Sequence, residues 1–334
     1  MLTRVIFRSR SWIPCRGQRR SFTGYQYQAE PEIPRVKYIR PVIWSAAAIG
    51  LIYFQAAQTE ITLDYKHNGI DSKRGTSLTF EQIEAERVDQ ARAEMRRRSN
   101  ANVSLYDLTS NQALATAWNS LTSVERAAGT VTGLNGMLHL SRIFFPDIRV
   151  AHLPIQNTNW TLLTSMFGHG GSFHLIANMY VLNSFALPVG ASKTFKGSTS
   201  HCVAFYLSSG ILSCLAYHLQ SAVKPMYRYI PCLGSSGAIY AMIGAFGMSH
   251  PDAGIGIIFL PFSVPAQQAL YGLAAFELYG TIFGWGLGLA HISHLTGLAV
   301  GVSYVYYNGG IHVWRNLKKF IYEVESGQRR EIRR

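Results

Sequence analysis

Charge is almost absent from one long stretch of this sequence, and that absence limits the folds open to the chain. Residues 253–314 carry a single formally charged side chain, Glu277. A soluble domain places charged residues on its solvated face, whereas two apolar helices joined by a short turn can lie in a lipid bilayer without any. The stretch therefore favours a polytopic membrane protein, and one very apolar soluble domain is the alternative.

Apolar segments of helical length also occur before this stretch. Residues 41–57 carry no charge, are flanked by Arg35, Lys37 and Arg40, and at about 1.5 Å per residue are just long enough to span a membrane. Core helices are predicted at 127–145, which is the weakest segment, and at 174–190, 201–222, 232–249, 262–283 and 287–307. We therefore predict an all-α polytopic membrane protein whose six-helix core is preceded by one extra transmembrane helix (1+6).

Positive charge is concentrated at the two ends of the chain. The formal net charge is +13, and several arginines precede the first acidic residue, Glu30. Between the ends there is no basic stripe with interleaved aromatic residues, so a nucleic-acid groove is not expected. Residues 1–28 combine Arg and Ser with scattered apolar residues, which is typical of a mitochondrial transit peptide. A disordered basic tail is the alternative.

Polar segments divide the chain further. Thr79 and Gln82 are spaced as a capping box, and a charged stretch to Arg98 follows, which we interpret as a solvated linker helix without a chemical role. Gly309-Gly310 is expected to end the last helix. The predicted domains are a mitochondrial presequence and basic N-terminal region at 1–40, an N-terminal transmembrane helix at 41–58, a polar linker at 59–119, a core at 120–308 and a basic C-terminal tail at 309–334.

The first polar group within the apolar segments is Gly234-Ser235-Ser236-Gly237, at the expected start of a helix. A serine there lies near unpaired backbone N–H groups and the positive end of the helix dipole, which favour an oxyanion on a substrate carbonyl. The flanking glycines allow another backbone to come close. Because Gly and Ser are also common at contacts between membrane helices, a packing role remains the alternative.

The second polar group is in the last core segment. Gly297 and Gly301 form a small-residue face that allows close approach of a neighbouring helix, and His294 lies about one turn before Gly297. A histidine held against such a neighbour is well placed to take a proton from a hydroxyl. An interhelical hydrogen bond is the alternative role.

The third polar group is His174 with Asn178, four residues apart and therefore on one helix face. Two neutral donors in an apolar region could stabilise an oxyanion, or could form interhelical hydrogen bonds. No carboxylate or cysteine accompanies these histidines, and the four cysteines show no C-x-x-C spacing. Neither a metal site nor a disulfide framework is therefore expected.

Taken in chain order, which is the third group, then the first, then the second, the three groups resemble the rhomboid family, whose pattern is H-x-x-x-N, then G-x-S-G, then A-H-x-x-G-x-x-x-G. The resemblance covers roughly residues 120–308, with Ser293 before the histidine and Thr296 in place of a frequent small residue. The run Ile257-Ile258-Phe259-Leu260-Pro261, the presequence and the extra helix are similar to the mitochondrial branch.

The resemblance implies roles for individual residues. Ser236, rather than Ser235, would be the nucleophile, and His294, rather than His291, the general base and acid. The oxyanion hole would be formed by His174, Asn178 and the Ser236 backbone N–H, with Gly234 nearby. Supporting residues would be Tyr240, which packs on the histidine, His169, with a structural role, and the glycines Gly237, Gly297 and Gly301.

The function implied is that of an intramembrane serine endopeptidase of the mitochondrial inner membrane. A Ser-His dyad without a third acid, and without a metal or organic cofactor, would cleave transmembrane protein substrates within the lipid bilayer through an acyl-enzyme. One alternative is a catalytically inactive, rhomboid-like protein that binds client helices. Another is a solute transporter, but no convincing inverted repeats of broken helices are found.

Overall fold

A computed structural model describes residues 35–68, 78–100, 111–145, 150–256, 263–284 and 289–331. The predicted presequence at 1–28 and the run Ile257-Ile258-Phe259-Leu260-Pro261 lie outside these residues. Helices dominate the described chain, and the two strands are three residues long. The segments before the core contain α1 (Ile39–His67), α2 (Phe80–Asn100) and α3 (Asn111–Ser120).

The core contains a helix at each of the six predicted segments. In chain order these are α4 (Ser123–Phe144), α6 (Ser172–Gly190), α7 (Thr199–Val223), α8 (Ser236–Ser249), α9 (Ala266–Phe283) and α10 (His291–Tyr306). Single helical turns join some of them: η2 (Pro154–Gln156), α5 (Thr161–Thr164), η3 (Ser165–Phe167) and η4 (Pro225–Arg228). An antiparallel hairpin of β1 (Gly254–Gly256) and β2 (Ser263–Pro265) connects α8 to α9, and Ile255 lies opposite Val264.

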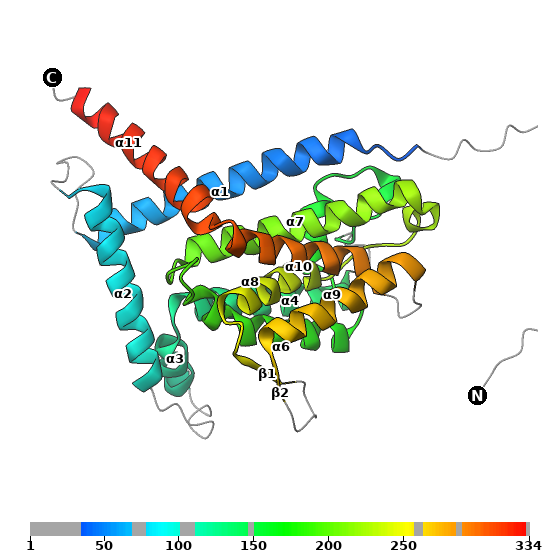
Figure 1. Ribbon diagram of the computed structural model, residues 1–334, viewed down its shortest axis with the longest axis horizontal. Helices are drawn as coiled ribbons and strands as arrows, with labels where there is room; N and C mark the ends of the chain where they lie inside the picture. The colour runs from blue at the N-terminus through cyan, green and yellow to red at the C-terminus, as the bar shows by residue number, and fades with distance from the viewer. Residues whose placement is uncertain are drawn as a thin grey trace, which may run out of the picture. The chain divides into compact units, whose positions relative to one another are not determined.

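The short helix α8 lies at the centre of the core and packs against α6, α7, α9 and α10 (Figure 1). Its side chains are mostly small, and nearly all its residues after Ser236 are buried. Small side chains let neighbouring helices approach closely on every side. The sequence of α8 therefore determines how tightly the helices around the candidate site can pack.

Helix α1 runs beside α7 (Figure 1). Among the described residues, α1 and α7 are long and apolar enough to cross a membrane by length and composition. Helix α7 is largely covered by other helices, whereas α1 exposes large apolar side chains such as Ile43 and Leu51. Exposed apolar side chains on a long helix suit contact with lipid tails, and the architecture is that of an all-α membrane protein.

One helix boundary differs from the prediction in a way that matters for the site. Helix α8 begins at Ser236 rather than at 232. Cys232 instead pairs with His152 through two backbone hydrogen bonds of 2.8 Å. After this bridge the chain turns at Gly234 and Ser235, and Ser236 lies in the first turn of the helix.

The capping box before α2 is confirmed, because the Thr79 backbone N–H donates to Gln82 Oε1 (2.7 Å) and the Gln82 N–H to Thr79 Oγ1 (3.3 Å). The predicted solvated linker helix is mostly exposed, but its first turns are buried against the rest of the chain. Phe80 and Ile83 are buried, and Glu84 and Arg87 join a buried cluster of charges.

The predicted basic tail is also structured. After α10 the chain forms a π-helical turn, η5 (Gly310–Arg315), and then α11 (Asn316–Glu331), which packs on α1. Gly309 does not have a positive φ, and Asn308 is the residue in the left-handed region, with φ 52°. The tail is helical because Lys318, Ile321 and Tyr322 face buried partners on α1 and α2.

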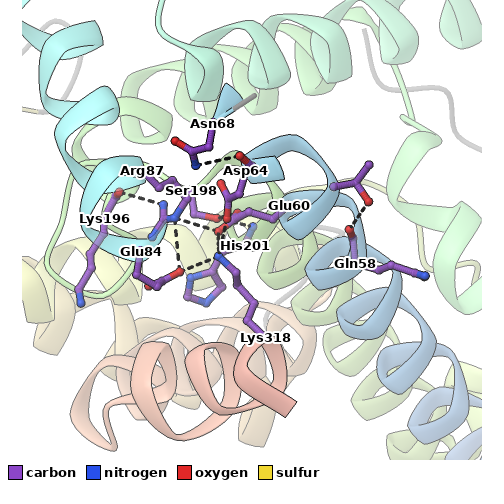
Figure 2. Close-up of polar contacts among 11 residues, drawn as sticks. Gln58, Glu60, Asp64, Asn68, Glu84, Arg87, Lys196, Ser198, His201 and Lys318 are labelled. Carbon is purple, nitrogen blue, oxygen red and sulfur yellow. Dashed lines mark hydrogen bonds and ion pairs between the residues drawn. The ribbon is translucent and has the colours of Figure 1, made fainter. Parts of the chain in front are cut away.

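Lys318 is the centre of the buried charge cluster (Figure 2). Its Nζ donates to Glu60 Oε1 (2.9 Å), Asp64 Oδ2 (3.1 Å) and Glu84 Oε1 (2.6 Å), and the lysine side chain is 1% exposed. Arg87 Nε lies 3.1 Å from Glu60 Oε1. The oxygen atoms of the three carboxylates are close enough to hold a metal ion, but the Lys318 ammonium already bonds to all three. The cluster thus connects α1, α2 and α11.

Electrostatics keep Lys318 and Glu84 ionised over a wide pH range, whereas burial outweighs the nearby Lys318 and raises the pKa of Asp64 to about 6. Burial lowers the pKa of Lys318, but the carboxylates of Glu60, Glu84 and Asp64 outweigh burial and raise it above 10.5. Burial raises the pKa of Glu84, but Lys318 and Arg87 outweigh it and lower the pKa below 4.5. The lysine therefore stabilises the fold fully below pH 10.5 and loses this effect above it, whereas Glu84 stabilises above pH 4.5 and loses its effect below.

Removing the Lys318 charge should loosen the attachment of α11. In Lys318→Met three carboxylates lose their shared donor, and breaking a buried ion pair costs about 3–5 kcal/mol. We expect backbone amides of 316–326 to exchange with deuterium on the order of 100-fold faster, as measured by mass spectrometry in detergent. Lys319→Met is the matched control. The Lys319 side chain is 44% exposed, and its substitution removes only two long surface ion pairs, of 3.9 Å each, with Glu81 and Glu323. Equal exchange in the two variants would contradict the assignment.

Candidate active site

Ser236 is placed by the loop that precedes α8. The Gly234 backbone N–H donates to the Ser165 carbonyl oxygen (2.9 Å), and Gly234 has a φ of 115°, which L side chains rarely adopt. Glycine is therefore required at this position. The first-turn backbone N–H groups of α8 have no partner within the helix, so Ser236 lies beside several free donors.

His294 lies opposite Ser236 on α10. The two side chains meet at 2.8 Å, between Ser236 Oγ and His294 Nε2. His294 is buried and Ser236 is half-buried. A serine hydroxyl hydrogen-bonded to an imidazole nitrogen is the arrangement in which the imidazole can take the hydroxyl proton. The structure thus brings together the two residues that the sequence singled out on different helices.

The distance between these side chains depends on a backbone contact between α8 and α10. A Cβ atom on Gly297 would collide with the carbonyl oxygen of Gly237, and one on Gly301 with that of Ala241. The predicted small-residue face of α10 therefore lies directly on the α8 backbone. With larger residues at these positions the helices would move apart, and His294 would move away from Ser236.

The neighbouring serine and histidine have other partners. Ser235 Oγ lies 3.4 Å from His169 Nε2, and Ser235 is fully buried. His291 Nδ1 lies 2.6 Å from Glu277 Oε2 rather than near either serine. Of the serines Ser235 and Ser236 and the α10 histidines His291 and His294, only Ser236 and His294 are hydrogen-bonded to each other.

Tyr240 lies one turn after Ser236 on α8 and stacks on His294. The ring centroids are 4.4 Å apart and the rings are nearly parallel, at 5°. The Tyr240 hydroxyl donates to Glu277 Oε1 at 2.6 Å. The stacked ring fixes the plane of the imidazole, as the resemblance implies.

Glu277 on α9 lies beside His294, and the sequence did not predict an acid at this place. Its Oε1 lies 3.1 Å from His294 Nδ1, and the residue is fully buried. The prediction that no third acid accompanies the pair is therefore wrong for the geometry of this chain. The available signal was the isolation of Glu277, the single charge in residues 253–314.

His174 and Asn178 lie on α6, beside the loop that contains Gly234. His174 Nδ1 accepts from the Gly170 backbone N–H (3.3 Å), so a neutral His174 has its proton on Nε2. A Cβ on Gly234 would lie 3.0 Å from His174 Nε2 and 3.9 Å from Ser236 Oγ, so the donor faces the serine region. Asn178 Nδ2 donates to the His174 carbonyl oxygen (2.7 Å) and has a second N–H.

His169 supports this region from the loop before α6. Its ring packs edge-on against His174, with centroids 5.3 Å apart, and its carbonyl oxygen accepts from Arg142 Nη1 (2.9 Å). The residue is buried and does not contact Ser236 or His294 through any hydrogen bond of the described chain. Its contacts are those of a structural residue.

The domain that contains this site is similar in sequence to known proteins. Residues 156–310 match the family model described as Rhomboid domain. The chain is 31% identical over 218 residues to "Presenilin-associated rhomboid-like protein, mitochondrial" of Rattus norvegicus, covering 61% of this chain and 54% of that protein. It is 35% identical over 161 residues to the Homo sapiens protein of that name, covering 48% and 40%. It is 29% identical over 147 residues to "Rhomboid protein 1, mitochondrial" of Saccharomyces cerevisiae, covering 44% and 41%.

The aligned part is limited in these relatives. The chain spans about half the length of the curated relatives it matches, 54% of the rat protein and 40% of the human one. The matched domain nevertheless contains Ser236, His294 and Glu277, together with the donors on α6.

A methyl group at the α8–α10 contact should destabilise the core. In Gly301→Ala the new Cβ meets the Ala241 carbonyl oxygen and, at 2.8 Å, the Ala245 nitrogen. Overpacking of this kind costs about 1–3 kcal/mol, so we expect a lower thermal unfolding temperature in detergent. Gly272→Ala on α9 is the control, because a Cβ there meets nothing within 4 Å. Equal unfolding temperatures for both variants would show that the contact is not tight.

Proposed function

We propose that the chain is an intramembrane serine endopeptidase of the rhomboid family that uses Ser236 and His294 as nucleophile and general base. The observation that carries the proposal is the 2.8 Å hydrogen bond between Ser236 Oγ and His294 Nε2. Residues distant in sequence and on separate helices meet here in the geometry that activates a serine.

The first half of the reaction forms an acyl-enzyme. His294 Nε2 takes the Ser236 proton while Ser236 Oγ bonds to the substrate carbonyl carbon, and the carbonyl electron pair moves onto oxygen. When the tetrahedral intermediate collapses, the C–N bond breaks and the amine leaves with the proton held by His294. The second half repeats these steps with water as the nucleophile, and it returns the proton to Ser236 Oγ.

Charge on the carbonyl oxygen would be stabilised by donors on α6 and α8. The Ser236 backbone N–H lies at the helix start, and His174 Nε2 faces the same region across Gly234. Asn178 contributes the amide N–H that is not used on the His174 carbonyl. Fixed donors aimed at a developing oxyanion usually supply a large part of the rate enhancement.

The substrates are transmembrane segments of mitochondrial inner-membrane proteins. A membrane helix hides its carbonyls in its own hydrogen bonds, so the substrate must unwind locally before Ser236 can attack. We propose that α1 and the six core helices all cross the inner membrane and that residues 1–28 direct import. The mitochondrial names of the relatives and the apolar exposed face of α1 support this placement.

A cleavage assay tests the proposal. Purified protein in detergent is incubated with a panel of single-span inner-membrane proteins, with Ser236→Ala and His294→Ala in parallel. We expect wild type to cut within or beside a membrane helix, and both variants to lose at least about 10³-fold in rate while remaining folded. Cleavage by the variants at the wild-type rate would overturn the assignment. Client binding without any cleavage would instead favour the inactive client-binding protein.

A further inference from the structure

We infer that Glu277 is a positioning residue for the reaction, the third member of a Ser236–His294–Glu277 chain of hydrogen bonds. The inference rests on the proposed function, because it assigns a task within the same site. It goes beyond a Ser-His pair, since it adds a negative charge next to the base.

Both carboxylate oxygens of Glu277 point at groups around the site. Oε1 accepts from the Tyr240 hydroxyl (2.6 Å) and lies 3.1 Å from His294 Nδ1, while Oε2 lies 2.6 Å from His291 Nδ1. The residue has no exposed surface. A carboxylate within apolar helices is costly, and such residues mark functional interiors unless they serve only to join helices. The position of Glu277 beside the base, rather than elsewhere on α9, points to function.

The carboxylate selects the tautomer of His294. An ionised carboxylate only accepts hydrogen bonds, so the proton of neutral His294 must be on Nδ1. The lone pair is then on Nε2, which faces Ser236 Oγ at 2.8 Å. Without this acceptor, His294 could carry its proton on Nε2, and the ring would then be unable to take the serine proton.

The carboxylate also balances charge during the reaction. His294 becomes a cation when it takes the Ser236 proton, and Glu277 Oε1 is then an opposite charge 3.1 Å from Nδ1–H. The surroundings are apolar helix interior, where such an attraction is little screened. The proton remains on the imidazole, so Glu277 acts by orientation and charge.

A purely structural task is the competing explanation. Glu277 could serve only to satisfy His291 and Tyr240 at the contact of α9 with α10. The variant Glu277→Gln separates the two explanations because it keeps the shape and removes the charge. The amide oxygen can accept from Tyr240 and His294, and the amide N–H₂ can donate to His291 Nδ1. His291 can shift its proton to Nε2, a buried atom without a hydrogen-bond partner among the described residues.

The test measures kcat, KM and thermal unfolding of the full-length protein in detergent, with a cleaved single-span substrate, for wild type, Ser236→Ala, Glu277→Gln and Glu277→Asp. We expect Glu277→Gln to lower kcat by about 10²–10⁴-fold with KM changed less than about twofold. Glu277→Asp keeps the charge, so its kcat should be at least about tenfold higher than that of Glu277→Gln. Thr281→Val is the control on the same helix, because it removes only a hydroxyl bonded to the Glu277 carbonyl oxygen (2.8 Å).

The outcomes separate this inference from the proposed function. If Ser236-dependent cleavage persists in Glu277→Gln at a kcat within about threefold of wild type, the inference is overturned and the serine mechanism stands. If Glu277→Gln and Glu277→Asp both lose thermal stability and substrate affinity together with kcat, the residue is structural and the inference is also overturned. If wild-type cleavage does not depend on Ser236, the proposed function fails, and this inference fails with it.

Discussion

The backbone contact between α8 and α10 is the constraint on which the rest of the core depends. Gly297 and Gly301 of α10 lie against the Gly237 and Ala241 carbonyl oxygens of α8, with no space for a side chain between them. Since His294 is one turn before Gly297, the contact sets where the imidazole lies relative to Ser236. The 2.8 Å hydrogen bond between Ser236 Oγ and His294 Nε2 is thus set by helix packing and not by the choice of side-chain rotamers.

Two buried carboxylate clusters show how this chain accommodates charge in its interior. Glu277 in the core is surrounded by hydroxyl and imidazole groups, which can donate without carrying a full charge. Glu60 and Glu84, at the junction of α1, α2 and α11, are paired with the ions Lys318 and Arg87. The second cluster joins three helices through buried ion pairs, as a structural cluster should. The Glu277 cluster, by contrast, lies next to His294, the proposed base.

Much of the fold and of the candidate site could be predicted from the sequence, because each rests on a local pattern. Apolar length located the helices, and the spacing of glycines around Ser236 and His294 indicated the close contact. The features that the sequence does not predict, the partners of Glu277 and of Lys318, depend on long-range contacts. Glu277 meets His291 and His294 through the rotation of α9 against α10, which spacing alone does not give. Lys318 meets partners more than two hundred residues earlier, so the sequence indicates a basic tail but not what the tail contacts.

Covalent trapping of the serine tests whether packing of α8 on α10 creates an activated nucleophile at Ser236. The folded protein would be treated with a fluorophosphonate, whose fluoride leaves as the serine oxygen bonds to phosphorus, and the modified peptide mapped by mass spectrometry. We expect a single phosphonate on Ser236, and none in His294→Ala, since an unassisted serine hydroxyl reacts poorly. Labelling at another serine, or equal labelling of Ser236 without His294, would contradict it.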